Sequence, residues 1–113
     1  MCGIAGFSRP ETASSIKNGR TFGIALAIGI EPRGRDATGF AWWERADRDN
    51  VWYSKKKGRA TVVAPCAPLP KKGISTLIAH TRYLTMGSAE INGNNHPVVS
   101  EHITAVHNGR IEN

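Results

Sequence analysis

Short runs of apolar residues, each bounded by glycine, proline or polar residues, predict several β-strands along the chain. The predicted strands cover residues 2–9, 39–45, 51–57, 76–83 and 103–107. Residues 46–50 are polar and turn-like, so the second and third strands are predicted to form a hairpin. Trp42 and Trp43 are adjacent and must point to opposite faces, so at least one ring is expected to meet a second layer.

In residues 16–30 the apolar residues recur roughly every three to four positions, which predicts a helix. A rough apolar stripe supports this prediction, made of Ile16, Phe22, Leu26 and Ile30. Three glycines, at positions 19, 23 and 29, weaken the helix propensity but allow the helix to lie close against a sheet. Pro32 is expected to end the helix, because a residue before proline, here Glu31, is disfavoured in the helical region.

Three segments are predicted to be turns or loops. Residues 33–39 form a tight turn, whose Arg33 and Asp36 either brace a site or make a local ion pair at the surface. Residues 64–72 hold three prolines and Cys66, which we interpret as incidental to the structure. Residues 84–97 are rich in glycine and asparagine.

Composition places the chain among soluble globular proteins. Its 113 residues suffice for one small domain, with 40% hydrophobic and 21% charged residues. The longest apolar run, residues 22–30, is too short to span a bilayer, and no signal peptide is evident. Two cysteines do not make a disulfide framework, so we expect a cytoplasmic protein without membrane contact.

The net charge of +6 permits binding to nucleic acid but does not require it. A basic run, residues 55–59, lies beside the aromatic residues of the predicted hairpin. It is either a nucleic-acid surface or a solvated strand end, and the second interpretation is favoured. We therefore do not expect nucleic acid as a partner.

Cys2 follows the initiator methionine and becomes the first residue if that methionine is removed. It then carries a thiol, which is a strong nucleophile as the thiolate, and an α-amine. The pKa of a free α-amine, roughly 7.7–8.0, lets it accept a proton near neutrality. This pairing is the chemistry of N-terminal nucleophile enzymes, although cysteine also occurs at position two by chance.

The predicted strand at residues 76–83 carries two polar side chains on one face, His80 and Arg82. An arginine on a buried strand is costly unless it binds something, so Arg82 is a candidate ligand-binding residue. His102 and His107 have one zinc-finger spacing, but an odd separation along a strand puts them on opposite faces. No metal site and no cofactor are expected.

Five blocks, in order, resemble the class II glutamine amidotransferases over most of the chain: MCGIAGF, RGRDATG, AHTRYLTMG, NHPVV and AVHNGRIEN. The resemblance implies an α+β, N-terminal nucleophile hydrolase fold, an αββα sandwich of antiparallel sheets. Residues 1–113 would be the N-terminal part of such a domain, incomplete at the C-terminus. It also implies hydrolysis of L-glutamine to glutamate, with ammonia passed to an acceptor such as a sugar phosphate in a synthase or isomerase domain outside this chain.

The roles of the family's residues carry over by position. The resemblance makes Cys2 the nucleophile, and Asn108 with Gly109 the oxyanion hole. It makes Arg82 the clamp on the glutamine carboxylate and places Thr85 and Met86 in the loop that lines the glutamine pocket. Arg33 and Asp36 match the family's RGxDxxG turn, which is expected to support the site.

The chain departs from the family pattern in two respects. Relatives have tryptophan and histidine where this chain has Tyr83 and Met86. The acidic residue that holds the glutamine α-amine would lie beyond Asn113, so we expect a fragment of a longer chain with little activity alone. The alternative hypothesis is a truncated non-catalytic remnant or a small basic binding module.

Overall fold

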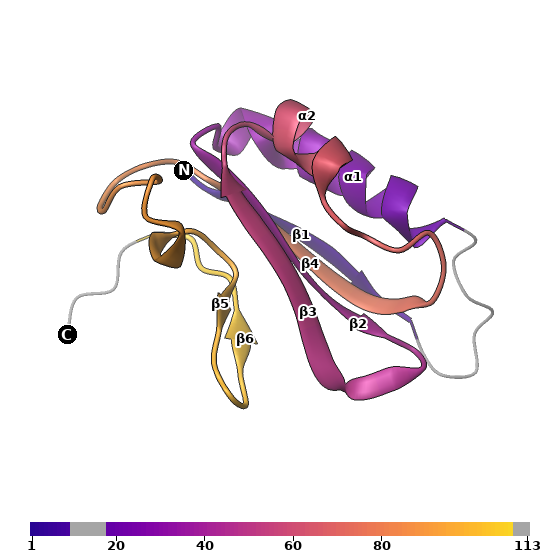
Figure 1. Ribbon diagram of the computed structural model, residues 1–113. Helices are drawn as coiled ribbons and strands as arrows, with labels where there is room; N and C mark the ends of the chain where they lie inside the picture. Colours follow the sequence, from indigo (N-terminus) through magenta and orange to yellow (C-terminus); the bar gives the residue numbers. More distant parts are fainter. Residues whose placement is uncertain (10–17, 110–113) are drawn as a thin grey trace.

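The computed structural model describes residues 1–9 and 18–109 and shows an α+β arrangement with two antiparallel sheets (Figure 1). The larger sheet has four strands in the order β1-β4-β2-β3, with β1 at Gly3–Ser8, β2 at Ala37–Glu44, β3 at Asp47–Lys57 and β4 at Ile74–Arg82. Helices α1 (Gly19–Ile30) and α2 (Ala60–Val63) cover one face, and the small sheet of β5 (Val98–Val99) and β6 (Thr104–Ala105) lies on the other side. The predicted α+β class is confirmed.

The register of the central strand brings the N-terminus to one end of the sheet. β4 pairs antiparallel with both β1 and β2, with Gly3 opposite Thr81 and Ala37 opposite Arg82. The start of β1, the end of β4 and the start of β2 therefore meet at the same end. Cys2, the turn before β2 and the loop after β4 are brought together there.

The hairpin differs from the prediction in its second strand. β3 begins at Asp47, so the link after Glu44 is Arg45-Ala46 and not residues 46–50. β3 is an edge strand of the sheet, and its first residues face solvent, where polar side chains are tolerated. The amide of Asn50 donates to the carboxylate of Asp47, at 2.9 Å, so polar residues that suggested a turn instead pair along the strand.

Helix α1 is shorter than predicted, and its fully buried positions lie beside the predicted stripe, of which Leu26 and Ile30 are partly buried against the core. It begins at Gly19 after the cap Asn18, whose side chain accepts from the backbone of Thr21, and Ile16 lies outside the described residues. Its buried residues are Gly19, Gly23 and Ala27, whereas Phe22 is 45% exposed. A Cβ at Gly23 would lie 2.9 Å from a methyl carbon of Leu77, so close packing on the sheet selected small residues. The predicted stripe was wrong at Phe22.

Helix α1 ends at Ile30 as predicted, but the expected cause, a non-helical Glu31, was wrong. Glu31 keeps helical dihedral angles, and Pro32 opens a 3₁₀ turn at Glu31–Arg33, where its missing N–H is no loss. The buried Glu31 carboxylate accepts hydrogen bonds from Arg59 and from the backbone and hydroxyl of Thr61. These contacts outweigh the preference of a pre-proline residue for extended backbone.

The core lies between α1 and the sheet. Its largest members are Phe40, Trp42 and Leu77, joined by several alanines and Leu69. Trp42 is buried there, which confirms that one of the two adjacent tryptophans meets a second layer, while Trp43 is on the opposite face.

The remaining segments are less regular than the main sheet. Within and before the predicted proline loop, the chain forms α2 and a 3₁₀ turn at Ala64–Cys66, and Cys66 is an exposed free thiol. β6 covers only Thr104–Ala105 instead of residues 103–107, and its partner β5 was not predicted. In the part of the chain that the structure describes, no helix has the length and apolarity needed to cross a membrane.

Candidate active site

The Cys2 thiol lies beside the residue that follows β4. Its Sγ accepts a hydrogen bond from the backbone N–H of Tyr83 at 3.2 Å and faces the carbonyl of the same residue at 3.6 Å. These residues are 81 positions apart in sequence and meet because β1 and β4 are antiparallel neighbours. The sulfur is held by backbone groups, which do not depend on the side chain at position 83.

The turn before β2 contacts the backbone of Cys2 and the start of the loop after β4. Arg33 donates from Nε to the backbone carbonyl of Cys2 at 3.0 Å. The Asp36 carboxylate accepts from the backbone N–H of Leu84 at 2.7 Å, at the start of the loop after β4. The structure thus places Arg33 and Asp36 as braces of this region and not as partners of each other.

Arg82 is only 7% exposed, and its guanidinium is turned into the loop that follows β4. Nη1 donates to Oδ1 of Asn95 at 3.0 Å, and Nη2 donates to the carbonyls of Met86 and Gly87. Asn95 is itself fully buried, and its amide donates to the carbonyl of Ala89. Arg82 therefore organises the loop around residues 86–95 as well as facing the cavity.

Tyr83 and Met86, the two residues that depart from the family pattern, contact the site through their backbone atoms. Tyr83 meets Cys2 through its N–H, and Met86 meets Arg82 through its carbonyl. Their side chains are 53% and 58% exposed. A change of side chain at either position leaves these backbone contacts in place.

Asn108 and Gly109 come from the far end of the sequence to the same place. The Asn108 amide donates from Nδ2 to the carbonyl of Cys2 at 2.8 Å, across 106 positions. Gly109 has φ +99°, a left-handed conformation that favours glycine, and it lines the cavity.

A cavity of about 240 Å³ joins these elements. Five predicted site residues line it: Cys2, Arg82, Thr85, Met86 and Gly109. The other three, Arg33, Asp36 and Asn108, contact residues of its wall, Asp36 through its backbone N–H to the carbonyl of Arg82. All eight predicted positions are therefore brought together.

Sequence reasoning missed a cluster of histidines in the same wall. His80, His96 and His107 line the cavity, and the rings of His80 and His96 stack with centroids 4.5 Å apart. The position of His80 on the same face as Arg82 was the only signal for this cluster. Burial is the main cause that lowers the pKa of His80, and burial together with His80 lowers the pKa of His96 to about 4.

Within residues 1–9 and 18–109, no three histidine, cysteine, aspartate or glutamate side chains are placed to hold a metal ion. His107 lines the cavity, whereas exposed His102 lies near Glu101 on the turn between β5 and β6.

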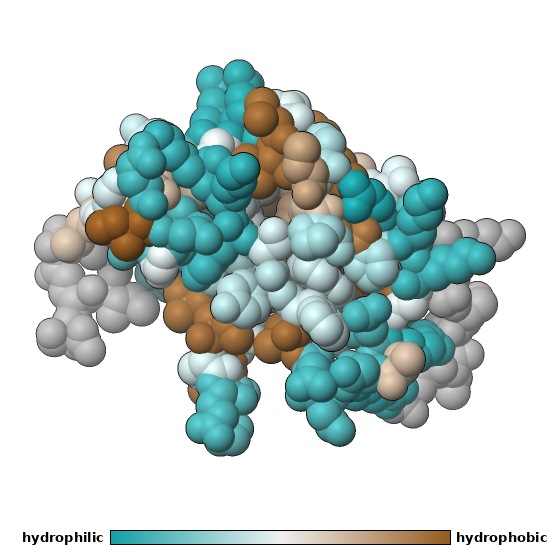
Figure 2. Space-filling view, viewed as in Figure 1, coloured by the Kyte–Doolittle hydropathy of each residue, from teal (hydrophilic) through white to brown (hydrophobic). Residues whose placement is uncertain are grey.

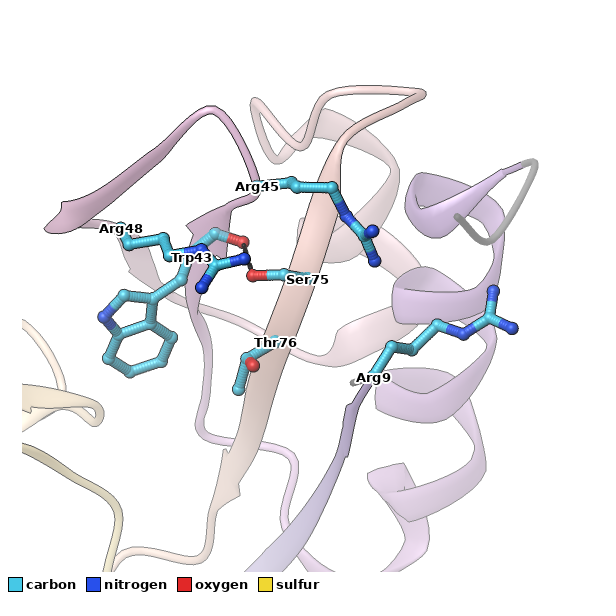
Figure 3. Close-up of a pocket in the computed structure, with 6 residues that line it drawn as sticks. All are labelled: Arg9, Trp43, Arg45, Arg48, Ser75 and Thr76. Carbon is cyan, nitrogen blue, oxygen red and sulfur yellow. Dashed lines mark hydrogen bonds between the residues drawn. The ribbon is translucent and has the colours of Figure 1, made fainter. Parts of the chain in front are cut away.

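A second hollow, of about 340 Å³, lies at the opposite end of β4 (Figure 3). Its lining combines arginines from the ends of β1 and the hairpin with Trp43 of β2 and Ser75 and Thr76 of β4. It contains none of the residues in the predicted site, and among the described residues no thiol or carboxylate lines it. Its larger volume therefore does not make it the better candidate for chemistry.

The basic run on β3 is used inside the molecule. Lys55 donates to the carbonyls of Asn95 and Pro97, both at 2.8 Å, and Lys57 pairs with Glu90. These two ammonium groups hold the loop beside the cavity, so they do not form a continuous free surface for phosphate groups.

Comparison with known proteins identifies relatives along the whole chain. It is 35% identical over 114 residues to glutamine-fructose-6-phosphate aminotransferase (isomerizing) from Pectobacterium atrosepticum and 35% identical over 115 residues to that of Escherichia coli K12. The protein of the same name from Halalkalibacterium halodurans is 34% identical over 119 residues. Each match covers 100% of this chain but only 17% of the relative. No family model matches the chain.

These relatives agree with the five motif blocks and with the site that the fold assembles from them. The chain is homologous to the N-terminal portion of the glutamine-fructose-6-phosphate aminotransferases, that is, of glucosamine-6-phosphate synthase, and so resembles the glutaminase domain of a class II glutamine amidotransferase.

Proposed function

We propose that residues 1–113 are the N-terminal part of a type-2 glutamine amidotransferase domain that hydrolyses L-glutamine and supplies ammonia to an acceptor. One observation carries the proposal. The Cys2 thiol, the Arg82 guanidinium and the Asn108–Gly109 pair, widely separated in sequence, meet around one cavity of about 240 Å³. This combination provides a nucleophile, a cation for a carboxylate and donors for an oxyanion.

The chemistry begins when removal of Met1 frees the α-amine of Cys2. The amine takes the thiol proton, and the sulfur attacks the side-chain amide carbon of glutamine. The tetrahedral intermediate collapses, the C–N bond breaks, and the amine returns the proton to the departing ammonia. Water, deprotonated by the same amine, then attacks the thioester, which releases glutamate and regenerates the thiol.

Asn108 suits the oxyanion because its amide has two N–H groups. One N–H donates to the carbonyl of Cys2, which fixes the amide next to the nucleophile. The second is left for the oxygen that becomes charged during attack, together with the backbone N–H of Gly109.

Arg82 suits the glutamine carboxylate for a similar reason. A guanidinium has five N–H groups, and the contacts to Asn95, Met86 and Gly87 use three of them. The two N–H groups that remain, one on Nε and one on Nη1, can each donate a charge-assisted hydrogen bond to a carboxylate, and a planar two-pronged contact requires Nη2 to release a loop carbonyl. Thr85 and Met86, which line the same cavity, are the loop residues we propose to contact the substrate.

The fold proposed for the complete domain is the αββα sandwich of N-terminal nucleophile hydrolases. The sheet face opposite α1 carries exposed apolar side chains, including Ile4 and Tyr53, and the β5–β6 hairpin exposes Val98 and Ile103. Figure 2 shows hydrophobic residues on both sides of the gap between this hairpin and the main sheet. Packing of a second sheet here would bury this surface, because stacked sheets bury their facing sides.

The named relatives are isomerizing aminotransferases of fructose 6-phosphate, so a sugar phosphate is the acceptor we propose. The partner is then a synthase or isomerase domain, and the compartment is the cytoplasm. No cofactor is needed for the glutaminase half-reaction, since thiol and amine supply both nucleophile and base.

Removal of the thiol tests the proposed function. We would use a chimera in which the E. coli relative supplies the sequence after position 113, with methionine removal verified by mass spectrometry. Cys2→Ala should abolish glutamine-dependent ammonia release, and Cys66→Ala, at an exposed thiol outside the cavity, should leave it unchanged. A glutamine-like electrophile should label Cys2 and spare Cys66. A chimera with an intact Cys2 but no turnover would support the non-catalytic alternative instead.

A further inference from the structure

We propose that His80 and His96 form a stacked imidazole pair that grips the backbone of His107 and thereby positions Asn108 for catalysis. The inference rests on the proposed function for its catalytic meaning, although the grip itself is a structural feature. His80 belongs to β4, His96 to the loop before β5, and His107 to the segment after β6. Neither imidazole is assigned a role in the glutaminase chemistry above.

The two rings hold the two polar backbone groups of one residue. The N–H of His107 donates to Nδ1 of His96 at 3.1 Å, and Nε2 of His80 lies 3.0 Å from the carbonyl of His107. The rings are nearly parallel, with 20° between their planes and 4.5 Å between centroids. The peptide groups on both sides of His107 are thus fixed from one direction.

This grip replaces strand pairing. β6 ends at Ala105, so in the described part of the chain His107 lies beyond the last paired residue of the small sheet. Buried or half-buried backbone groups need partners, and here side chains from two other segments supply them. The backbone conformation between β6 and Asn108 is therefore fixed by hydrogen bonds to the two imidazoles and not by strand pairing.

The contacts specify the protonation state of each ring. An acceptor Nδ1 on His96 requires a neutral ring with its proton on Nε2. A carbonyl accepts only, so Nε2 of His80 must carry a proton and donate. Nδ1 of His80 is buried and has no partner among the described residues, so a second proton there would be an unpaired charge.

The surroundings keep both rings neutral. The positive groups that face the pair are Arg82 on β4 and Lys55 on β3, and His107 lies against both rings. A charged imidazole would be repelled by these groups while buried from water. The acceptor lone pair that the N–H of His107 needs is thus preserved at neutral pH.

The backbone of His96 is seated directly on the sheet. A Cβ added to Gly39 of β2 would lie 1.9 Å from the carbonyl oxygen of His96, so only glycine allows this approach. Lys55 donates to the carbonyls of the residues on either side, Asn95 and Pro97. A rigid strand therefore supports His96, which supports His107, whose neighbour Asn108 contacts Cys2.

Asparagine and glutamine substitutions distinguish the contributions of the two ring nitrogens of each histidine. The asparagine side-chain amide mimics Nδ1 and that of glutamine mimics Nε2, so His96→Asn and His80→Gln retain the observed contacts. His96→Gln and His80→Asn place the amide at the wrong nitrogen. In the active chimera, we expect the mismatched pair to lower kcat by up to roughly a hundredfold with little change in KM, because misplacement acts on the transition state. The matched pair should stay close to wild type.

Two further measurements show whether a loss of kcat comes from unfolding, and test the imidazole contacts without relying on the proposed glutaminase activity. Thermal unfolding should show similar midpoints for the matched and mismatched variants of each histidine. Long-range proton–nitrogen NMR of the 113-residue chain should show His96 protonated at Nε2 only and His80 protonated at Nε2 only. Reversed tautomers, or equal kcat for matched and mismatched variants, would overturn the inference.

If no variant hydrolyses glutamine, including the chimera with both histidines, the proposed function fails. The positioning of His107 by the two imidazoles is then tested by a measurement that does not need activity. The side-chain amide signals of Asn108 should then shift in the mismatched variants and hold in the matched ones. Shifts of equal size in both pairs would contradict a positioning role.

Discussion

At the scale of single residues, the carbonyl oxygen of Cys2 is the point where the site is assembled. It accepts from Arg33 on the turn before β2 and from Asn108 near the other end of the chain. Two donors on one carbonyl use both of its lone pairs, which fixes the peptide that follows the nucleophile. The position of the thiol therefore depends on residues from three parts of the sequence.

Replacement of Asn108 should affect the chemical step. The charge that its free N–H would meet appears only when the thiolate attacks, so Asn108→Ala should lower kcat by roughly a hundred- to a thousandfold. Steady-state ammonia release by the chimera measures this. Asn50→Ala is the control, because Asn50 pairs with Asp47 on the edge strand. A change confined to KM would exclude Asn108 from the oxyanion hole.

Replacement of Arg82 should act on binding, because the glutamine carboxylate does not react. Arg82→Lys keeps the charge but loses the planar fork, so KM should rise while kcat changes less. The structure adds a second effect, since the same guanidinium holds the carbonyls of Met86 and Gly87. The variant should therefore also unfold at a lower temperature, and unchanged stability would show that these loop contacts contribute little.

At the scale of elements, the Glu31 carboxylate joins the end of α1 to the start of α2. Hydrogen bonds from Arg59 and Thr61 lower the pKa of Glu31 to about 2, from an ordinary 4.5. Because the folded-state pKa is depressed, this contribution to stability is complete above pH 4.5 and is lost as the pH falls toward 2. Glu31→Gln should therefore lower the unfolding midpoint at pH 7, and the deficit relative to wild type should shrink in acid.

Replacement of glycine by alanine is expected to have opposite effects on stability at two positions in different elements. Gly39→Ala would push a methyl group into the backbone of His96 and should destabilise the protein by about 1–3 kcal/mol or more, as overpacking does. Gly29 lies on α1, and no atom of the described residues is within 4 Å of an added Cβ, so Gly29→Ala should stabilise the protein by about 0.5–1 kcal/mol through helix propensity. Denaturant unfolding of both variants checks the pair, and a stable Gly39→Ala would contradict the seating of His96.

At the scale of the whole molecule, the free energy of unfolding should decrease on mild acidification, at pH values above those at which Glu31 is protonated. The pKa of His96 is lowered to about 4 from 6.5, mainly by burial, and that of His80 is lowered in the same direction. The unfolded chain thus binds more protons between pH 6.5 and 4, and stability decreases as the pH falls through this window. His96→Asn should flatten the dependence in unfolding measurements, while a similar change at exposed His102 should not.

Strong periodic patterns determined the main strands without reference to the rest of the molecule. β1, β2 and β4 lie where short apolar runs predicted them, with boundaries shifted by a few residues. The alternation along β4 correctly placed His80 and Arg82 on one face. Motif positions likewise named eight residues that the fold gathers around one cavity. These features depend on local geometry or on chemistry that particular residue types carry.

Other features were decided only when distant segments met. The glycines of residues 16–30 indicated that the helix lies close to a sheet, but only the structure decided that Gly19 and Gly23 are buried and Phe22 is exposed, because that depends on the distance between α1 and Leu77. It could not show that the polar start of β3 is an edge strand, because strand order is a property of the sheet. The histidine pair is the clearest case. This pair and His107, which it contacts, come from positions up to 27 residues apart, and their role depends on which ring nitrogen faces which backbone atom. Hydrogen-bond partners of buried polar groups are chosen by tertiary contacts, and no local pattern encodes them.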